Sequence, residues 1–260
     1  MGTPFTVVDA FTDRPFAGNP AAVMLLDAFP DDQMLTSLAA EHQYAETAFL
    51  VRQGRGYYHL RWFTPTVEVP LCGHGTLAAS HALYTEHGED VPSLRFDTAS
   101  GQLNVSREGN GYKLDFPIAD QWDTLDTAAV AYAIGVMPSE VMKGKFLIAV
   151  VDSEETVRAL KPDLAKVAEL PGDEIVVTAP GIATDFVSRM FGPKIGIPED
   201  PFTGATHTML APYWAARLGK SKLSGHQASA RGGDVVCEVA GERVFLFGNA
   251  VTTMRGQMAL

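Results

Sequence analysis

The sequence predicts an α+β protein of two pseudo-symmetric halves, each a mixed sheet wrapped around a central helix. One observation is a phrase that occurs twice: residues 63–76 and 191–207 both read Phe-x-Pro, a short spacer and Pro-x-x-Gly. Both copies run into an alanine-rich stretch that is typical of a helix. A second observation is that Glu46 begins an apolar run before the first phrase, much as Glu174 does before the second. Together they indicate a duplicated fold.

In the first half, apolar runs bounded by turn residues predict the elements in order. A turn over residues 17–20 contains Gly and Asn, which tolerate positive φ. A helix starts at Asp31 or Asp32 as its N-cap and reaches His42. Its expected apolar face consists of Met34, Leu35, Leu38 and Ala39. A second helix is predicted over 77–87, and strands over 5–10, 21–26, 46–51, 57–63, 94–96, 104–106 and 112–116.

The pattern restarts after residues 117–124, where we place the domain boundary, with an N-terminal half over 1–117 and a C-terminal half over 118–249. The second half is predicted to contain strands over 146–151, 174–179 and 186–191, with helices before and after the first of them. The second phrase then leads into a helix over 206–217. Residues 229–234 are typical of a hairpin connection between closing strands.

Composition excludes several function classes. The net charge of −11 and the lack of a Lys/Arg cluster argue against nucleic acid as a partner. No apolar run is long enough to span a bilayer, so no membrane partner is expected. The two cysteines, Cys72 and Cys237, cannot form a disulfide framework, which indicates a reducing compartment and predicts a cytoplasmic protein.

Each glycine turn is a candidate anion site, because a strand that opens directly into a helix presents free N–H groups and the positive end of the helix dipole. In the first turn Gly73 and Gly75 allow close approach of a ligand, and His74 between them is a candidate proton donor. The alternative is that His74 only caps the helix or packs in the core.

In the second turn Asp200 precedes the glycine, where the helix dipole favours an ionised carboxylate that could bind an amine, ammonium or hydroxyl. The alternative is a structural carboxylate that accepts from loop amides. Thr203 and Thr206 offer hydroxyls beside backbone N–H groups, a possible cradle for a substrate carboxylate. They could equally be ordinary capping residues.

Glu46 stands at the start of an otherwise apolar strand. A carboxylate that enters the core is costly unless it is paired or protonated, which makes Glu46 a candidate general acid/base. By spacing alone, a strand-end residue that reaches solvent is at least as good an interpretation.

No metal or nucleotide cofactor is expected. His74 and His81 are seven residues apart, about 10 Å along a helix, too far to share a metal ion. The sequence has no H-x-x-x-H, C-x-x-C, dinucleotide or P-loop pattern.

These motifs together resemble the PhzF family of phenazine-biosynthesis-like isomerases, and the match runs from end to end. The matching segments are Phe16–Val23, Ala45–Phe49, Trp62–Pro65, Leu71–Thr76, Glu199–Gly204 and Ala211–Trp214. The resemblance implies the fold of diaminopimelate epimerase, with residues from about 250 to 260 returning to the first half.

The resemblance also implies a homodimer and a biosynthetic, cofactor-independent isomerase that moves a proton on a small unsaturated or amino/hydroxy carboxylic acid in the cleft between the halves. The catalytic residues it implies are Glu46, His74 and Asp200, with Glu46 carrying the proton from carbon to carbon. The residues expected to bind the substrate are Gly73, Gly75, Thr76, Gly204, Ala205 and Thr206.

Two departures bear on the substrate. The family member acting in phenazine synthesis has serines where this chain has Ala45 and Ala205, which argues against the phenazine precursor but not against isomerisation. A two-thiol racemase or epimerase of the same fold is disfavoured, because the second turn has no cysteine; Cys72 alone is interpreted as a small buried filler. A catalytically idle member that binds a ligand or a protein is the remaining alternative.

Overall fold

A computed structural model describes residues 2–259, and the chain divides into two compact units. One contains the residues up to Asp115 together with those from Phe247 onward, and the other contains Phe116–Leu246. We describe each unit by itself.

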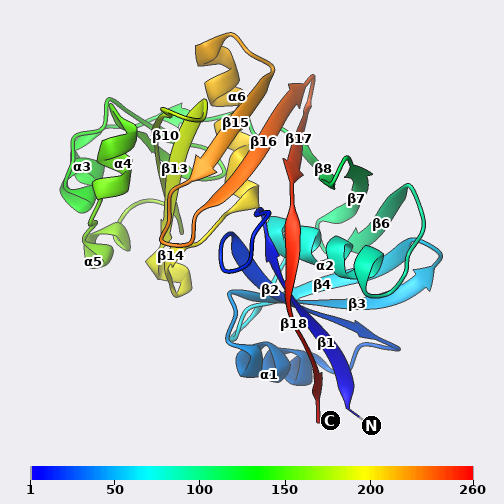
Figure 1. Ribbon diagram of the computed structural model, residues 1–260. Coiled ribbons are helices and arrows are strands. Elements are labelled where there is room, and N and C mark those ends of the chain that lie inside the picture. The colour runs from blue at the N-terminus through cyan, green and yellow to red at the C-terminus, as the bar shows by residue number, and fades with distance from the viewer. Residues whose placement is uncertain (1, 260) are drawn as a thin grey trace. The chain divides into compact units, whose positions relative to one another are not determined.

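The first unit is a mixed sheet around helix α2 (Gly73–Thr85), which packs against β1, β2, β3 and β18 (Figure 1). Strand β18 pairs antiparallel with β1, so the end of the chain lies beside its beginning. From β18 the neighbours are β1, β2, β3, β4, β6 and β7, with parallel pairing at β2–β3 and β4–β6. The elements are β1 (Thr3–Ala10), β2 (Asn19–Leu26), α1 (Asp32–His42), β3 (Glu46–Gly54), β4 (Tyr57–Phe63), β5 (Glu68–Val69), α2, β6 (Ser93–Thr98), β7 (Gly101–Glu108), β8 (Gly111–Pro117) and β18 (Ala250–Met258).

The second unit repeats this pairing pattern around helix α6, which packs against β15 and β16. From β9 the neighbours are β10, β11, β12, β13, β15 and β16, again with parallel pairing at the third and fifth steps. The sheet and helix order therefore confirms the α+β prediction of two similar halves. The elements are β9 (Asp123–Thr124), α3 (Ala128–Ile134), β10 (Glu140–Lys143), β11 (Leu147–Val150), α4 (Glu154–Ala159), α5 (Leu164–Val167), β12 (Ile175–Pro180), β13 (Phe186–Gly192), η1 (Pro193–Ile195), β14 (Ile197–Asp200), η2 (Gly204–Thr206), α6 (His207–Leu218), β15 (Lys222–Gln227), β16 (Gly233–Ala240) and β17 (Arg243–Gly248).

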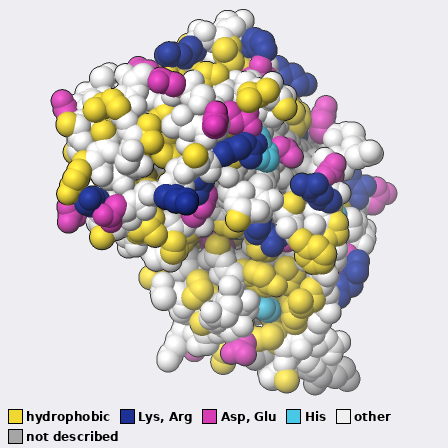
Figure 2. Space-filling view, turned by 60° about the vertical axis from the view of Figure 1, so that its left-hand side comes forward, with side chains coloured by type: hydrophobic (Ala, Val, Ile, Leu, Met, Phe, Trp, Pro, Cys, Tyr) yellow, Lys and Arg dark blue, Asp and Glu magenta, His cyan; other side chains and the backbone are white. Residues whose placement is uncertain are grey.

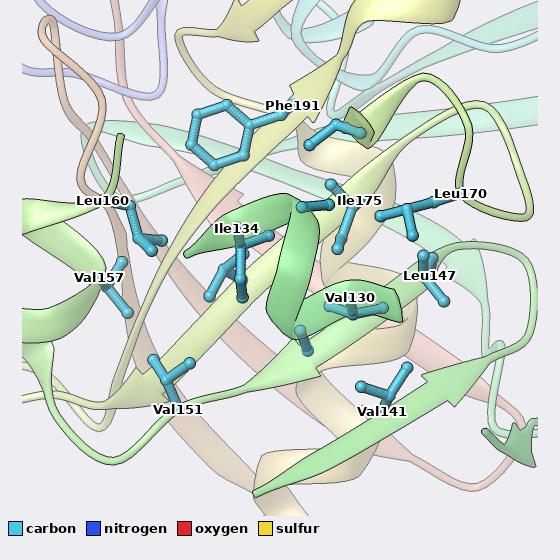
Figure 3. Close-up of a cluster of buried hydrophobic side chains, with 14 of the residues drawn as sticks. Val130, Ile134, Val141, Leu147, Val151, Val157, Leu160, Leu170, Ile175 and Phe191 are labelled. Carbon is cyan, nitrogen blue, oxygen red and sulfur yellow. The ribbon is translucent and has the colours of Figure 1, made fainter. Parts of the chain in front are cut away.

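Each unit buries the outer face of its sheet under short helices. In the first unit Leu35, Leu38 and Ala39 of α1 pack on Met24, Phe49 and Phe63. Met34 is 44 % exposed, so its predicted place on the apolar face is wrong. In the second unit the side chains of α3 and α4 gather with those of β11–β13, as Figure 3 shows for Ile134, Val157 and Phe191.

Helix α2 starts at Gly73, four residues before the predicted position. Cys72 is its N-cap, and the Cys72 sulfur accepts a hydrogen bond from the Gly75 N–H at 3.3 Å. Glycine is a poor helix former, so the pattern hid this first turn. The Cβ of any larger residue at Gly75 would lie 2.8 Å from Cδ1 of Trp62, which explains the glycine by close approach. His74 consequently belongs to the helix itself.

Candidate functional site

Parallel pairing places the first group of site residues at one edge of a sheet. Ala21 of β2 lies opposite Glu46 of β3, so Asn19 and Glu46 stand near the starts of two adjacent parallel strands. Helix α2 packs on these strands and directs its first turn toward them. Glu46 and His74 therefore meet, with His74 Nε2 3.1 Å from Glu46 Oε2.

His74 is buried and has a polar neighbour on each side of its ring. Nδ1 lies 3.2 Å from the side-chain amide nitrogen of Asn19 and 3.6 Å from the sulfur of Cys72. A side-chain amide can donate through its nitrogen or accept through its oxygen. Asn19 can therefore pair with Nδ1 of His74 whether or not that nitrogen carries a proton. The sequence did not predict Asn19 and Cys72 as candidate site residues. The Gly-Asn-Pro segment predicts a turn and belongs to one of the segments that carry the family resemblance, and Cys72 is expected to be a buried filler.

Electrostatics favour a charged His74. Burial alone would lower the pKa of His74, but the neighbouring Cys72 sulfur and Glu46 carboxylate outweigh burial and hold it well above the ordinary histidine value. Burial, and then the charge of Glu46, raise the pKa of the Cys72 thiol.

Glu46 Oε2 is buried, and among residues 2–259 it has no hydrogen-bond partner. It lies close to His74 Nε2, yet the pair does not have hydrogen-bond geometry. Both groups consequently remain able to contact a third atom.

In the first turn of α2, two backbone N–H groups have no hydrogen-bond acceptor among residues 2–259. The N–H of Gly75 is bonded to Cys72 Sγ, and both donors of Thr76 go to the Cys72 carbonyl oxygen. This leaves the N–H groups of Gly73 and His74 at the positive end of the helix. The predicted substrate-binding roles of Gly75 and Thr76 stay predictions.

The second predicted group stands together in the other unit. Asp200 ends β14 and is buried; its carboxylate accepts from the Thr203 hydroxyl, and its carbonyl accepts from the Gln227 amide at 2.8 Å. Gln227 also accepts from the Thr203 N–H at 2.9 Å. The Thr206 hydroxyl donates to the Thr203 carbonyl at 2.8 Å, which closes the η2 turn containing Gly204 and Ala205. Catalytic and binding roles for this group stay predictions.

His207, the first residue of α6, is fully buried between Phe186 and Phe202, and Nδ1 donates to the Thr203 carbonyl. Burial lowers its pKa to about 4. Because the folded pKa lies below the unfolded value of 6.5, the stability from neutral His207 is complete above pH 6.5 and is lost as pH falls toward 4.

We expect this one group to cost about 2 kcal/mol of unfolding free energy between pH 7 and pH 5. Urea unfolding of wild type and His207→Phe at both pH values measures it. The variant lacks the hydrogen bond to Thr203 at both pH values, so this loss cancels in the comparison. The decrease in unfolding free energy from pH 7 to pH 5 should therefore be about 2 kcal/mol smaller in His207→Phe than in wild type. An equal fall in both proteins would contradict the assignment.

Comparison with known proteins decides the family. Residues 8–256 match the family model described as phenazine biosynthesis-like protein. The chain belongs to the phenazine biosynthesis-like (PhzF) family. An uncharacterized isomerase of Pseudomonas aeruginosa is 49 % identical, with 97 % of each chain covered. The solved structure of a PhzF family protein of Enterococcus faecalis is 40 % identical, with a TM-score of 0.94 and complete coverage of both chains.

A probable proline racemase of Agrobacterium radiobacter has a TM-score of 0.64 at 13 % identity, over 99 % of this chain and 93 % of its own, and shares the fold alone. The diaminopimelate epimerase-like fold prediction is confirmed. So are the resemblance and the prediction of an isomerase, since several relatives of this PhzF chain carry that name.

The two-thiol alternative gains no support. Cys237 lies in β16, is 0 % exposed, and has a thiol pKa raised by burial. A thiol enclosed in the core of its own unit is not placed to exchange a proton with a substrate.

On the face in Figure 2, acidic and basic side chains are interspersed rather than gathered by sign. None of the described helices of this PhzF protein is long and apolar enough to cross a membrane.

Proposed function

We propose that the protein is a cofactor-independent isomerase that moves a proton between two carbon atoms of a small unsaturated or amino/hydroxy carboxylic acid. The observation that carries the proposal is the buried Oε2 of Glu46, which lies 3.1 Å from His74 Nε2 and has no hydrogen-bond partner within the described part of the chain. A buried carboxylate held beside a cation and open to a third atom suits general acid/base catalysis.

In this reaction Glu46 Oε2 takes a proton from one carbon of the substrate. The electron pair left behind shifts along the conjugated system, and the same oxygen returns the proton to another carbon. His74 stabilises the carboxylate before and after the transfer, and Asn19 fixes its ring. The free N–H groups of Gly73 and His74 hold the substrate carboxylate or the developing negative charge.

Exchange with solvent tests the proposal. The wild-type protein is incubated in heavy water with a panel of small unsaturated amino and hydroxy acids, and deuterium at carbon is followed by NMR. At least one member should take up label at a carbon position. If thermal shift shows that panel members bind while none exchanges, the protein is a ligand-binding member of the family and the proposal is wrong.

A further inference from the structure

The fold assembles three metal-ligating side chains that the sequence keeps apart. Glu46 comes from β3, Cys72 from the cap of α2 and His74 from its first turn, and one ligand atom of each lies within 4.8 Å of the others. Carboxylate, thiolate and imidazole are the three donor types that proteins use for Zn²⁺. The spacing rules applied to the sequence miss this cluster, because it depends on how β3 lies beside the helix.

The distances are close to those of a shared ion. Tetrahedral bonds of about 2.3 Å to sulfur and about 2.0–2.1 Å to nitrogen separate those two ligands by about 3.6 Å. Cys72 Sγ lies 3.9 Å from His74 Nε2, the same nitrogen that lies 3.1 Å from Glu46 Oε2. Cys72 Sγ is also 3.6 Å from Nδ1, but Nδ1 has Asn19 as its neighbour, so Nε2 is the ring nitrogen left for the ion.

A second observation points to a ligand at this spot. Glu46 Oε2 is buried and forms an ion pair with His74 Nε2 at 3.1 Å, but among the described residues no group meets it with hydrogen-bond geometry. Asn19 lies on the opposite ring nitrogen, where an amide oxygen would hold the Nδ1–H of a metal-bound histidine. The positive end of the α2 dipole disfavours a bound cation. The two negative charges of the Cys72 thiolate and the Glu46 carboxylate outweigh this partial charge.

We propose that Glu46 Oε2, Cys72 Sγ and His74 Nε2 bind one soft divalent cation of the Zn²⁺ class, with the fourth position open to water. Binding releases two protons to solvent, one from the Cys72 thiol and one from Nε2 of His74. The bound cation occupies the lone pairs of Glu46 and His74, and therefore blocks proton transfer; this last clause rests on the proposed function.

Cobalt is the probe, because a thiolate bound to Co²⁺ gives a charge-transfer absorption in the near ultraviolet. Titration of the metal-free protein with Co²⁺ alone should show this band at one ion per chain, and Zn²⁺ should abolish it. Cys72→Ser should remove the band while the serine hydroxyl preserves the helix cap. Cys237→Ala, which removes the other thiol, should leave the band intact. His74→Gln should weaken binding at least about tenfold.

No band at millimolar Co²⁺, or a band that persists in Cys72→Ser, would overturn the site. The absorption does not depend on turnover, so a failure of the isomerase proposal leaves this test unaffected. Stoichiometric Zn²⁺ that leaves deuterium exchange unchanged would overturn the blocking effect.

Discussion

Glu46→Gln should lower deuterium exchange into the substrate about 10²–10⁴-fold, the contribution typical of a positioned general acid/base. Glutamine has nearly the same shape as glutamate, and its amide can still contact His74. It cannot accept a proton from carbon near neutral pH. The loss should therefore appear in turnover rather than in substrate binding or in the free energy of unfolding.

Glu41→Gln is the matched control. Glu41 lies near the end of α1, is exposed and belongs to no site described above, so its exchange rate should equal that of wild type. Initial rates of label uptake measured by NMR, with urea unfolding of each protein, separate chemistry from stability. An equal rate in Glu46→Gln and wild type would refute the proton-transfer role of Glu46.

Gly18→Ala should destabilise the protein by at least about 3 kcal/mol, combining the left-handed backbone cost with overpacking. Gly18 has φ +62°, and a Cβ there would overlap the carbonyl oxygen of Ala10. Backbone atoms of β1 cannot move aside as a flexible side chain would. Because Asn19 follows directly, the displaced turn should also loosen the contact between Asn19 and His74.

Gly88→Ala separates the two contributions. Gly88 has φ +65°, nearly the same conformation, but nothing lies within 4 Å of its added Cβ. Its cost should be the left-handed conformation alone, about 1–2 kcal/mol. Urea unfolding of both variants at pH 7 measures the difference. Equal losses would show that the Ala10 carbonyl is not a barrier.

Much of the fold could be predicted because local chemistry determines it. Asp31 caps α1 as expected for a short acceptor before a helix with one apolar face, and strands such as β12 follow apolar runs. The start of α2 could not be predicted, because its first turn contains two glycines that only tertiary packing makes helical.

Two residues of the candidate site, Glu46 and His74, could be predicted from the sequence, but Asn19, Cys72 and the assembly of the site could not. Glu46 and His74 are residue types that often transfer protons, so the sequence points to them. Asn19 and Cys72 become candidates only because the fold places them beside the ring of His74. Their meeting depends on parallel pairing of β2 with β3, which no local pattern encodes. Met34 was misplaced for a similar reason, since helical periodicity does not say where the sheet beneath ends.

The pairing of β18 with β1 sets an order of events on the ribosome. Strand β1 is made before the other described elements of its unit, and β18 is made after them. At about 5–20 residues per second, roughly 10–50 s of translation separate them. Throughout that interval the outer edge of β1 lacks its final partner, a state that invites pairing with other chains. The second unit is one continuous stretch of the chain, so it does not need a segment made much later to complete its sheet. In nascent chains stalled before β18, only the first unit should therefore have an unpaired strand edge that needs protection from aggregation.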